Sequence, residues 1–270
     1  MSSTPEQNER HPDGQISTEV RGNIFLIGID RPEKYNGFTP KMFSELADAY
    51  AELENNSELW VGVLFAHGKH FTAGLDLPKF ADAMKKGEAI LPTNGIDPFS
   101  LKPPFRTKPV VAAMNGICYT AAIELMLATE IVVSARSARY SQLEVGRGVM
   151  AAAGATFRMV ERAGWGNAMK VLLTGYEFNA EEALRYNFIQ EIVDDGEEFN
   201  RALELAEEIA KQAPLAVQAT LQSSRAYYFD SPKAAVDEFI PVMKALANTE
   251  DAAEGVQSFI EKRPPVYKGK

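Results

Sequence analysis

The sequence predicts an α/β protein, and two observations support this prediction. Over roughly the first 200 residues, short apolar runs rich in β-branched residues alternate with segments of helical periodicity. Beyond residue 200, only helical patterns follow. The chain has 270 residues, of which 46% are hydrophobic, which is enough for a sizeable core. We expect a disordered leader over residues 1–15, an α/β core over 16–200 and a helical region over 201–270.

Strands are expected where short apolar runs lie between turn residues. Residues 16–30 have the pattern of a β-hairpin with its turn at Arg21-Gly22-Asn23. The other expected strands are 59–66, 108–116, 131–135, 138–142 and 189–194. The run at 59–66 is apolar almost throughout, which is typical of a parallel strand buried on both faces.

Helices are expected where apolar residues recur every three to four positions. The first begins after Thr39, a good N-cap, with Pro40 at the first helical position. Residues 78–105 begin as a helix and end in a loop rich in proline and glycine, the most lid-like segment of the chain. The other expected helices are 119–130, 153–164, 165–175, 179–188, 197–214, 215–229, 231–247 and 249–263.

Composition excludes several classes of protein. The net charge of −9 argues against binding nucleic acid, which requires a basic face. A single cysteine, Cys118, excludes an intrachain disulfide and cysteine-based metal sites, and only three histidines are present. No apolar run reaches the length of about 18 residues that a membrane span needs, and the leader does not resemble a signal peptide. We expect a cytoplasmic protein without a bound metal.

Glu124 is the most informative single residue. Its neighbours along the predicted helix, including those three and four positions away, are almost all apolar. Burying an unpaired carboxylate costs several kcal/mol or raises its pKa. The residue is therefore either held by a buried arginine or an amide, or it is a catalytic carboxylate.

Glu144 is a second candidate and follows an expected strand. On the sequence alone, a glutamate beside Arg147 in a polar loop is expected to form a surface ion pair. Two carboxyls near one substrate atom could instead divide the roles of acid and base.

Two stretches offer backbone N–H groups in place of reactive side chains. "HFTAGLDL" leaves a buried strand through the small residues Ala73 and Gly74, which keep the backbone of Leu75 accessible. Ala121 lies in the first turn of a predicted helix, where N–H groups have no partner within the helix. Two such donors meeting at one oxygen would form an oxyanion hole.

The chain resembles the crotonase family, the enoyl-CoA hydratase/isomerase superfamily, along almost its whole length after the leader. The matching stretches are "IDRPEKYNGFTPKM", "HFTAGLDL", "KPVVAAMNGICYTAAIELMLATE", "YSQLEVGRGVMAAAGATFRMVERAG", "AMKVLLTG", "AEEALRYNFIQEIV" and "FIEKRPPVYKGK". Thr120-Ala121-Ala122 stands where the hydratases usually have three glycines, and Leu143 stands where a proline commonly precedes the second glutamate. These replacements leave every implied catalytic group in place and are expected to alter the acyl pocket.

The resemblance implies a crotonase-like spiral of ββα units with a helical C-terminal trimerisation region. It implies that Leu75 and Ala121 supply the oxyanion-hole N–H groups and that Glu124 and Glu144 are the catalytic glutamates. It implies further contacts with the CoA thioester at Lys34, Tyr35, Gly37, Ala73, Gly74, Asp76, Leu77, Lys79, Phe259 and Lys268, of which Phe259 and Lys268 would come from a neighbouring subunit.

The activity implied is that of an enoyl-CoA hydratase, a lyase that adds water across the 2,3 double bond of a 2-enoyl-CoA. The alternatives are a double-bond isomerase or another enolate-forming acyl-CoA enzyme on the same fold, and a non-catalytic acyl-CoA-binding member. No cofactor is implied, because coenzyme A is part of the substrate. A homotrimer or homohexamer is expected, and the identity of the acyl chain stays open.

Overall fold

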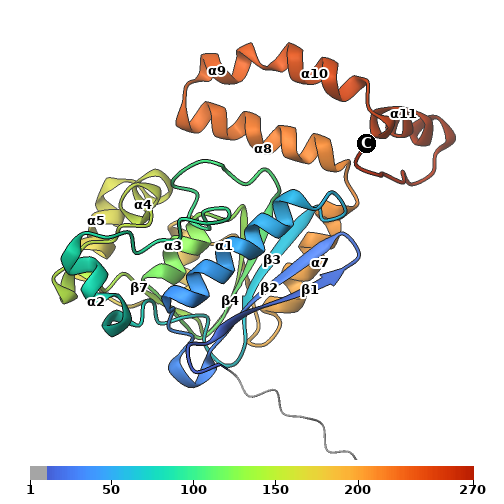
Figure 1. Ribbon diagram of the computed structural model, residues 1–270. Helices are drawn as coiled ribbons and strands as arrows, with labels where there is room; N and C mark the ends of the chain where they lie inside the picture. The colour runs from blue at the N-terminus through green and yellow to red at the C-terminus, as the bar shows by residue number, and fades with distance from the viewer. Residues whose placement is uncertain (1–10) are drawn as a thin grey trace, which may run out of the picture.

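The computed structural model describes residues 11–270, and its centre is a six-stranded sheet (Figure 1). The strand order is β1-β2-β3-β4-β6-β9, in which β1 and β2 form the antiparallel hairpin and every later pair is parallel. The bounds are β1 Gln15–Arg21, β2 Ile24–Asp30, β3 Val61–Ala66, β4 Val110–Met114, β6 Ile131–Ala135 and β9 Glu191–Val193. Because β4 is buried along its whole length and β3 over its first four residues, the apolar runs at 59–66 and 108–116 correctly indicated interior strands.

A second, smaller sheet has the order β5-β7-β8, with bounds Ile117–Tyr119, Arg139–Ser141 and Phe178–Asn179. Successive segments of chain build both sheets together. β4 leads into β5, and β6 leads into β7, so that β4 pairs with β6 while β5 pairs with β7. The segment after β3 joins the second sheet through a single bridge between Thr72 and Cys118. The chain is thus a spiral of ββα units, as the resemblance implied.

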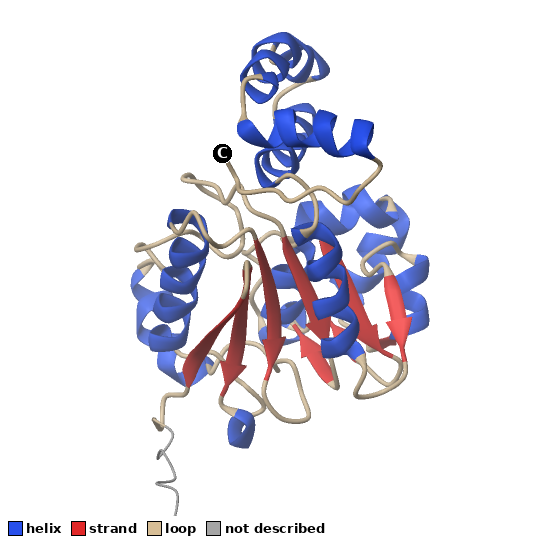
Figure 2. Ribbon diagram, turned by 90° about the vertical axis from the view of Figure 1, so that its right-hand side faces the viewer, coloured by secondary structure: helices blue, strands red, loops and turns tan. Residues whose placement is uncertain are grey.

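Helices cover both faces of the large sheet (Figure 2). One face packs against α7 (Glu198–Ala210), whose Ala202 and Ala206 lie among Val61, Val63 and other apolar side chains of β2, β3, β4 and β6. The other face supports the larger core, to which α1 (Pro40–Asn55) contributes six buried residues. The remaining helices of this part are α2 Leu77–Lys86, α3 Ala121–Leu127, α4 Ala155–Ala163, α5 Trp165–Thr174 and α6 Ala180–Arg185, with short 3-10 helices η1 Pro32–Lys34 and η2 Glu144–Arg147.

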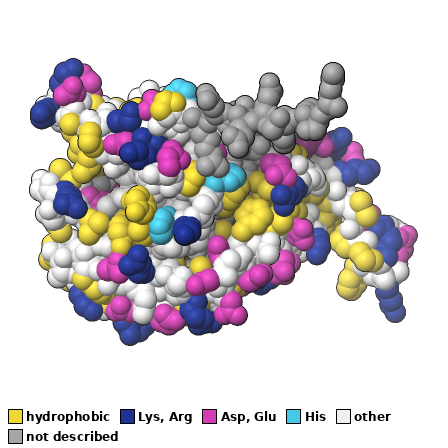
Figure 3. Space-filling model, turned by 90° about the horizontal axis from the view of Figure 1, so that it is seen from below, with side chains coloured by type: hydrophobic (Ala, Val, Ile, Leu, Met, Phe, Trp, Pro, Cys, Tyr) yellow, Lys and Arg dark blue, Asp and Glu magenta, His cyan; other side chains and the backbone are white. Residues whose placement is uncertain are grey.

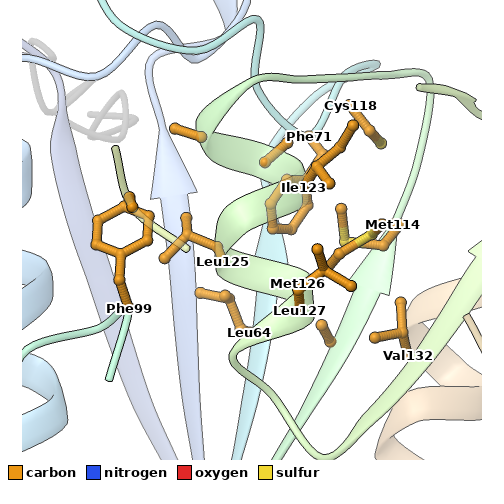
Figure 4. Packing of buried hydrophobic residues seen from close by; sticks show 14 of the residues in the cluster. Leu64, Phe71, Phe99, Met114, Cys118, Ile123, Leu125, Met126, Leu127 and Val132 are labelled. Atoms are coloured by element: carbon orange, nitrogen blue, oxygen red, sulfur yellow. The ribbon is translucent and has the colours of Figure 1, made fainter. Parts of the chain in front are cut away.

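Helix α3 is the most deeply buried helix, and every one of its seven residues is inside the protein. Leu125, Met126 and Leu127 point in different directions around its axis and each meets apolar neighbours (Figure 4). A helix with no polar face must lie in the interior, so the sequence pattern and the structure agree.

The last four helices form an arm that extends from the core (Figures 1 and 2). They are α8 Pro214–Phe229, α9 Pro232–Asp237, α10 Phe239–Ala247 and α11 Glu250–Glu261. Large apolar side chains on the arm are open to solvent, among them Ile240, Phe259 and Ile260. Where α8 meets the core, Glu130 binds both Arg106 and Arg225, and Arg106 is 1% exposed.

Three features differ from the expectations. Residues 1–10 of the expected leader lie outside the described residues, whereas residues 11–14 are fastened to the core: the Thr39 hydroxyl donates to the Asp13 carbonyl at 2.8 Å. The helix expected over 231–247 is broken at Glu238, three residues before Pro241, which has no N–H to donate. Strands β5 and β8 were not expected, because two or three residues are too few to show a period.

Surface charge is mixed on the face seen from below, where positive and negative side chains alternate with small apolar areas (Figure 3). None of the helices described between residues 11 and 270 is long and apolar enough to cross a membrane.

Candidate active site

The turn after β3 presents the backbone of Leu75. The Thr72 hydroxyl donates to the Asn36 carbonyl at 2.7 Å and accepts from the Gly74 N–H at 3.1 Å, which fixes the turn. Phe38 then bridges the strand on both sides of Leu75: its N–H donates to the Gly74 carbonyl, and its carbonyl accepts from the Asp76 N–H. The Leu75 N–H itself has no acceptor within residues 11–270, so it is free to donate to a ligand.

The start of α3 presents a second free N–H, that of Ala121. The preceding Thr120 has φ +50° and ψ −109°, a conformation that a β-branched residue rarely adopts. Ala121 itself begins the helix with helical geometry and needs no glycine there. Its N–H finds no acceptor among the described residues, as expected for the first residue of a helix. The conformational strain at this corner therefore falls on Thr120.

Gly74 and Thr120 bring these two corners into contact. A Cβ atom added to Gly74, whose φ is +101°, would lie 1.9 Å from the Thr120 hydroxyl oxygen. Only glycine therefore fits at position 74. The contact fixes the spacing between the two turns that carry the free N–H groups, and both Leu75 and Ala121 line the same cavity.

Glu124 is 4% exposed and lies one turn into α3. Its Oε1 accepts hydrogen bonds from the N–H groups of Ala153, at 2.7 Å, and Ala155, at 3.2 Å. Burial raises its pKa to about 7, and the charge of Glu144 adds to this effect, while the two N–H donors and Arg158 oppose it. The residue is thus held by backbone amides, as one of the two interpretations from the sequence expected, while its catalytic role stays a prediction.

Glu144 begins η2 and faces the same cavity. Burial raises its pKa, while a hydrogen bond from the Gln142 side chain to Oε1, at 3.0 Å, opposes the rise. The second oxygen, Oε2, is buried and has no partner within residues 11–270. The expected surface ion pair with Arg147 is absent, because Glu144 turns towards Gln142 and the cavity instead.

One cavity, of about 570 Å³, joins these groups. Its walls come from the turn after β3, the lid-like segment, the start of α3 and the η2 region. Besides the four groups above, its lining is largely apolar and comprises Phe43, Ala73, Leu77, Met84, Ala89, Ile90, Leu91, Phe99, Thr120, Leu143, Val149, Met150, Ala152 and Ala153 with the charged Glu88, Lys102 and Arg147.

The other residues implied as substrate contacts fall into three groups. Ala73 and Leu77 line the cavity, with Gly74 between them and Tyr35 and Gly37 on the adjoining loop. Asp76 and Lys79 are engaged elsewhere, because Asp76 pairs with Arg31 at 2.8 Å and Lys79 with Asp13 at 2.5 Å. Lys34 is exposed, and its ammonium has no ion-pair partner in the described chain.

Phe259 and Lys268 do not reach this cavity. Phe259 is in α11 and 86% exposed, and the Lys268 N–H donates to Asp251 on the same arm. In Figure 1, α11 lies at the upper right of the molecule and α2 at the lower left.

Sequence reasoning missed three groups near the glutamates. These are the N–H donors of Ala153 and Ala155, the Gln142 amide and the buried Arg158. The donors come from a turn about thirty residues after Glu124, so only the packing of α4 against α3 brings them together. Gln142 could have been found, because it lies two residues from Glu144.

The chain is similar to known proteins along most of its length. The sequence profile of the enoyl-CoA hydratase/isomerase family matches residues 19–270. The chain is 30% identical over 264 residues to (E)-benzylidenesuccinyl-CoA hydratase of Thauera aromatica, covering 94% of this chain and 99% of the relative. It is 29% identical over 247 residues to 2,3-dehydroadipyl-CoA hydratase of Escherichia coli K12, covering 92% and 96%. The crystal structure of a probable enoyl-CoA hydratase/isomerase from Mycobacterium abscessus superimposes with a TM-score of 0.91 at 39% identity, covering 94% and 98%.

Proposed function

Because the chain is an enzyme of the enoyl-CoA hydratase/isomerase family, we propose that it adds water across the 2,3 double bond of a 2-enoyl-CoA thioester. One observation supports this most strongly. Two glutamates from separate elements, the buried Glu124 and the half-buried Glu144, share one cavity with the free N–H groups of Leu75 and Ala121.

The two N–H groups are proposed to receive the thioester carbonyl oxygen. When a nucleophile adds at Cβ, negative charge develops on that oxygen as an enolate forms. Donors that are already in place stabilise this charge without having to reorganise, and each can be worth about 2.7–4 kcal/mol. The contact between Gly74 and Thr120 keeps the donors at a fixed separation.

The two carboxyls are proposed to divide acid and base roles. Ionising both in one apolar cavity is unfavourable, so the pair favours a state that holds one proton. Two backbone N–H groups stabilise the ionised form of Glu124, which is the proposed base that deprotonates water. Glu144 lines the cavity, and its buried Oε2 has no hydrogen-bond partner in residues 11–270; it is the proposed acid that protonates Cα. Every step in this scheme uses protein groups, so no metal or redox cofactor is needed.

A double-bond isomerase is the second candidate, since it would need only one carboxylate to move a proton. The retention of a second glutamate in the cavity, Glu144, whose pKa is also raised, favours hydration over this alternative and over a non-catalytic role.

The test is the loss of enoyl-thioester absorbance with crotonyl-CoA and with longer and aromatic 2-enoyl-CoAs. Wild type should hydrate at least one of them, and Glu124→Gln and Glu144→Gln should each lose the activity. Glu161→Gln is the matched control, because burial also raises the pKa of Glu161 but this residue lies outside the cavity. If wild type hydrates no enoyl-CoA, the hydratase assignment fails; conversion of a 3-enoyl-CoA that only one glutamate variant loses would indicate an isomerase.

The CoA phosphates are proposed to bind near Lys34, which is exposed and has no ion-pair partner in residues 11–270. The arm is proposed to assemble homotrimers or hexamers, because its exposed Ile240, Phe259 and Ile260 would then be covered. In such an assembly Phe259 and Lys268 could approach a neighbour's substrate. Light scattering should report three or six copies, and Ile240→Glu with Phe259→Glu should lower the mass. The cytoplasmic location stays a prediction from the sequence.

A further inference from the structure

Arg147 is a cation at the wall of the cavity, and no group in residues 11–270 neutralises it. Its side chain forms neither a hydrogen bond nor an ion pair within residues 11–270. The nearest carboxylate in the sequence, Glu144, is held by Gln142. The flanking Gly146 and Gly148 have open space where a Cβ would lie, so the segment leaves the guanidinium room to move towards a ligand.

A second cation lines the same cavity from a different segment. Lys102 lies in the lid-like segment, and its ammonium donates one hydrogen bond to the Pro92 carbonyl, at 3.0 Å, without a carboxylate partner among the described residues. Glu88, the remaining charged residue of the lining apart from the two glutamates, lies 3.9 Å from Lys86. The cavity therefore has two positive groups to spare.

An uncharged acyl chain gives these cations nothing to bind. A hydrocarbon chain would pack against the apolar lining alone, and the two cations would then stay hydrated at the edge of the cavity. A carboxylate on the acyl group would instead meet a planar guanidinium that can donate two parallel hydrogen bonds. The positive charge of the guanidinium would also offset the repulsion between the substrate carboxylate and the cavity glutamates Glu124 and Glu144.

We propose that Arg147 determines specificity by binding a carboxylate carried on the acyl group, assisted by Lys102, so that this protein prefers enoyl-CoA thioesters of dicarboxylic acids. This inference rests on the proposed function, because it concerns the acyl end of the same cavity. It assigns Arg147 to binding and leaves the reacting atoms to the groups described above.

The size of the effect follows from the strength of a hydrogen bond to a charged group. Such bonds correspond to a roughly 10- to 100-fold change in kcat/KM. Since Arg147 is exposed to solvent, the preference should weaken as salt is added.

The experiment compares two thioesters of equal length that differ in one charge. These are hex-2-enedioyl-CoA and its ω-methyl ester. The corresponding eight-carbon pair tests a second acyl-chain length. Wild type should favour the free acid 10- to 100-fold. Arg147→Gln should remove the preference while leaving kcat/KM for the ester within about 3-fold, and Arg147→Lys should keep part of it. Arg21→Gln, an exposed arginine on β1, is the control.

Two outcomes overturn the inference. The first is a wild-type enzyme that handles acid and ester equally at both lengths. The second is an Arg147→Gln variant that loses the same factor on both, which would place the arginine on the CoA moiety that the substrates share.

Binding of the saturated adipoyl-CoA and its methyl ester, measured by calorimetry, separates this inference from the proposed function. An Arg147-dependent preference for the free acid supports the carboxylate site even if no hydration is seen. Equal binding of the two overturns it even if hydration is seen.

Discussion

Gly74→Ala tests whether the two free N–H groups act together. The added Cβ would lie 1.9 Å from the Thr120 hydroxyl oxygen and 3.2 Å from its Cβ. Ordinary contact needs about 3.5 Å, so one of the two turns must move by about 1.5 Å. Leu75 follows the first turn directly and Ala121 follows the second, so either movement displaces a donor.

The expected result is a fall in kcat of roughly 100- to 1,000-fold, the effect of losing one oxyanion donor. The alanine at φ +101° should also lower the free energy of unfolding by about 1–3 kcal/mol. The assay is the hydration rate at saturating crotonyl-CoA, with circular dichroism to show that the variant is folded.

Two further variants make this result interpretable. Gly22→Ala is the control, because Gly22 has φ +59° in the β1–β2 turn and nothing lies within 4 Å of the added Cβ. It should lose stability and keep kcat. Adding Thr120→Ala to Gly74→Ala removes the closest contact and should restore part of the activity. A folded Gly74→Ala enzyme with kcat within 3-fold of wild type would refute the assignment of the donors.

Other predictions concern stability. The pKa of Glu124 is about 7 in the folded protein and near 4.5 in the unfolded chain. The stability that its protonated form contributes is therefore fully present below pH 4.5 and is lost as the pH rises through 7. The free energy of unfolding of Glu124→Gln, measured by denaturant titration, should therefore rise relative to that of wild type by up to roughly 3 kcal/mol between pH 5 and 8. A difference between the two proteins that does not change with pH would contradict the raised pKa. Arg106→Gln removes a buried partner of Glu130 and should cost about 3–5 kcal/mol of unfolding free energy; a loss below 1 kcal/mol would show that Arg225 alone suffices. Thr39→Ala removes the N-cap bond to the Met42 N–H and should cost about 1 kcal/mol in the same titration, whereas no loss would mean that Pro40 alone starts α1.

Much of the core could be predicted because its signals are local. An apolar run predicts a buried strand, and the pair Thr39-Pro40 predicts where α1 begins. The same holds for Glu124, whose burial follows from its neighbours on one helix. The arrangement of the strands in two sheets was available only through the family resemblance.

The site was less predictable where contacts join distant segments. The N–H groups that donate to Glu124 come from the turn before α4 and from its first residue, and no feature of residues 150–155 predicts this contact. Arg147 was expected to pair with Glu144, and that expectation is wrong. Two oppositely charged neighbours in the sequence do not pair when one side chain points into a cavity. Here the Gln142 amide, and not Arg147, binds the Glu144 carboxyl.

The spiral also governs when the protein becomes active as it folds. Leu75, Ala121 and Glu144 come from three successive units, each of which adds strands beside the previous ones. Such parallel pairing joins residues far apart in the chain and forms slowly. Helical signal after dilution from denaturant should therefore return before activity does, because a chain with one unit undocked has much of its secondary structure but an incomplete site.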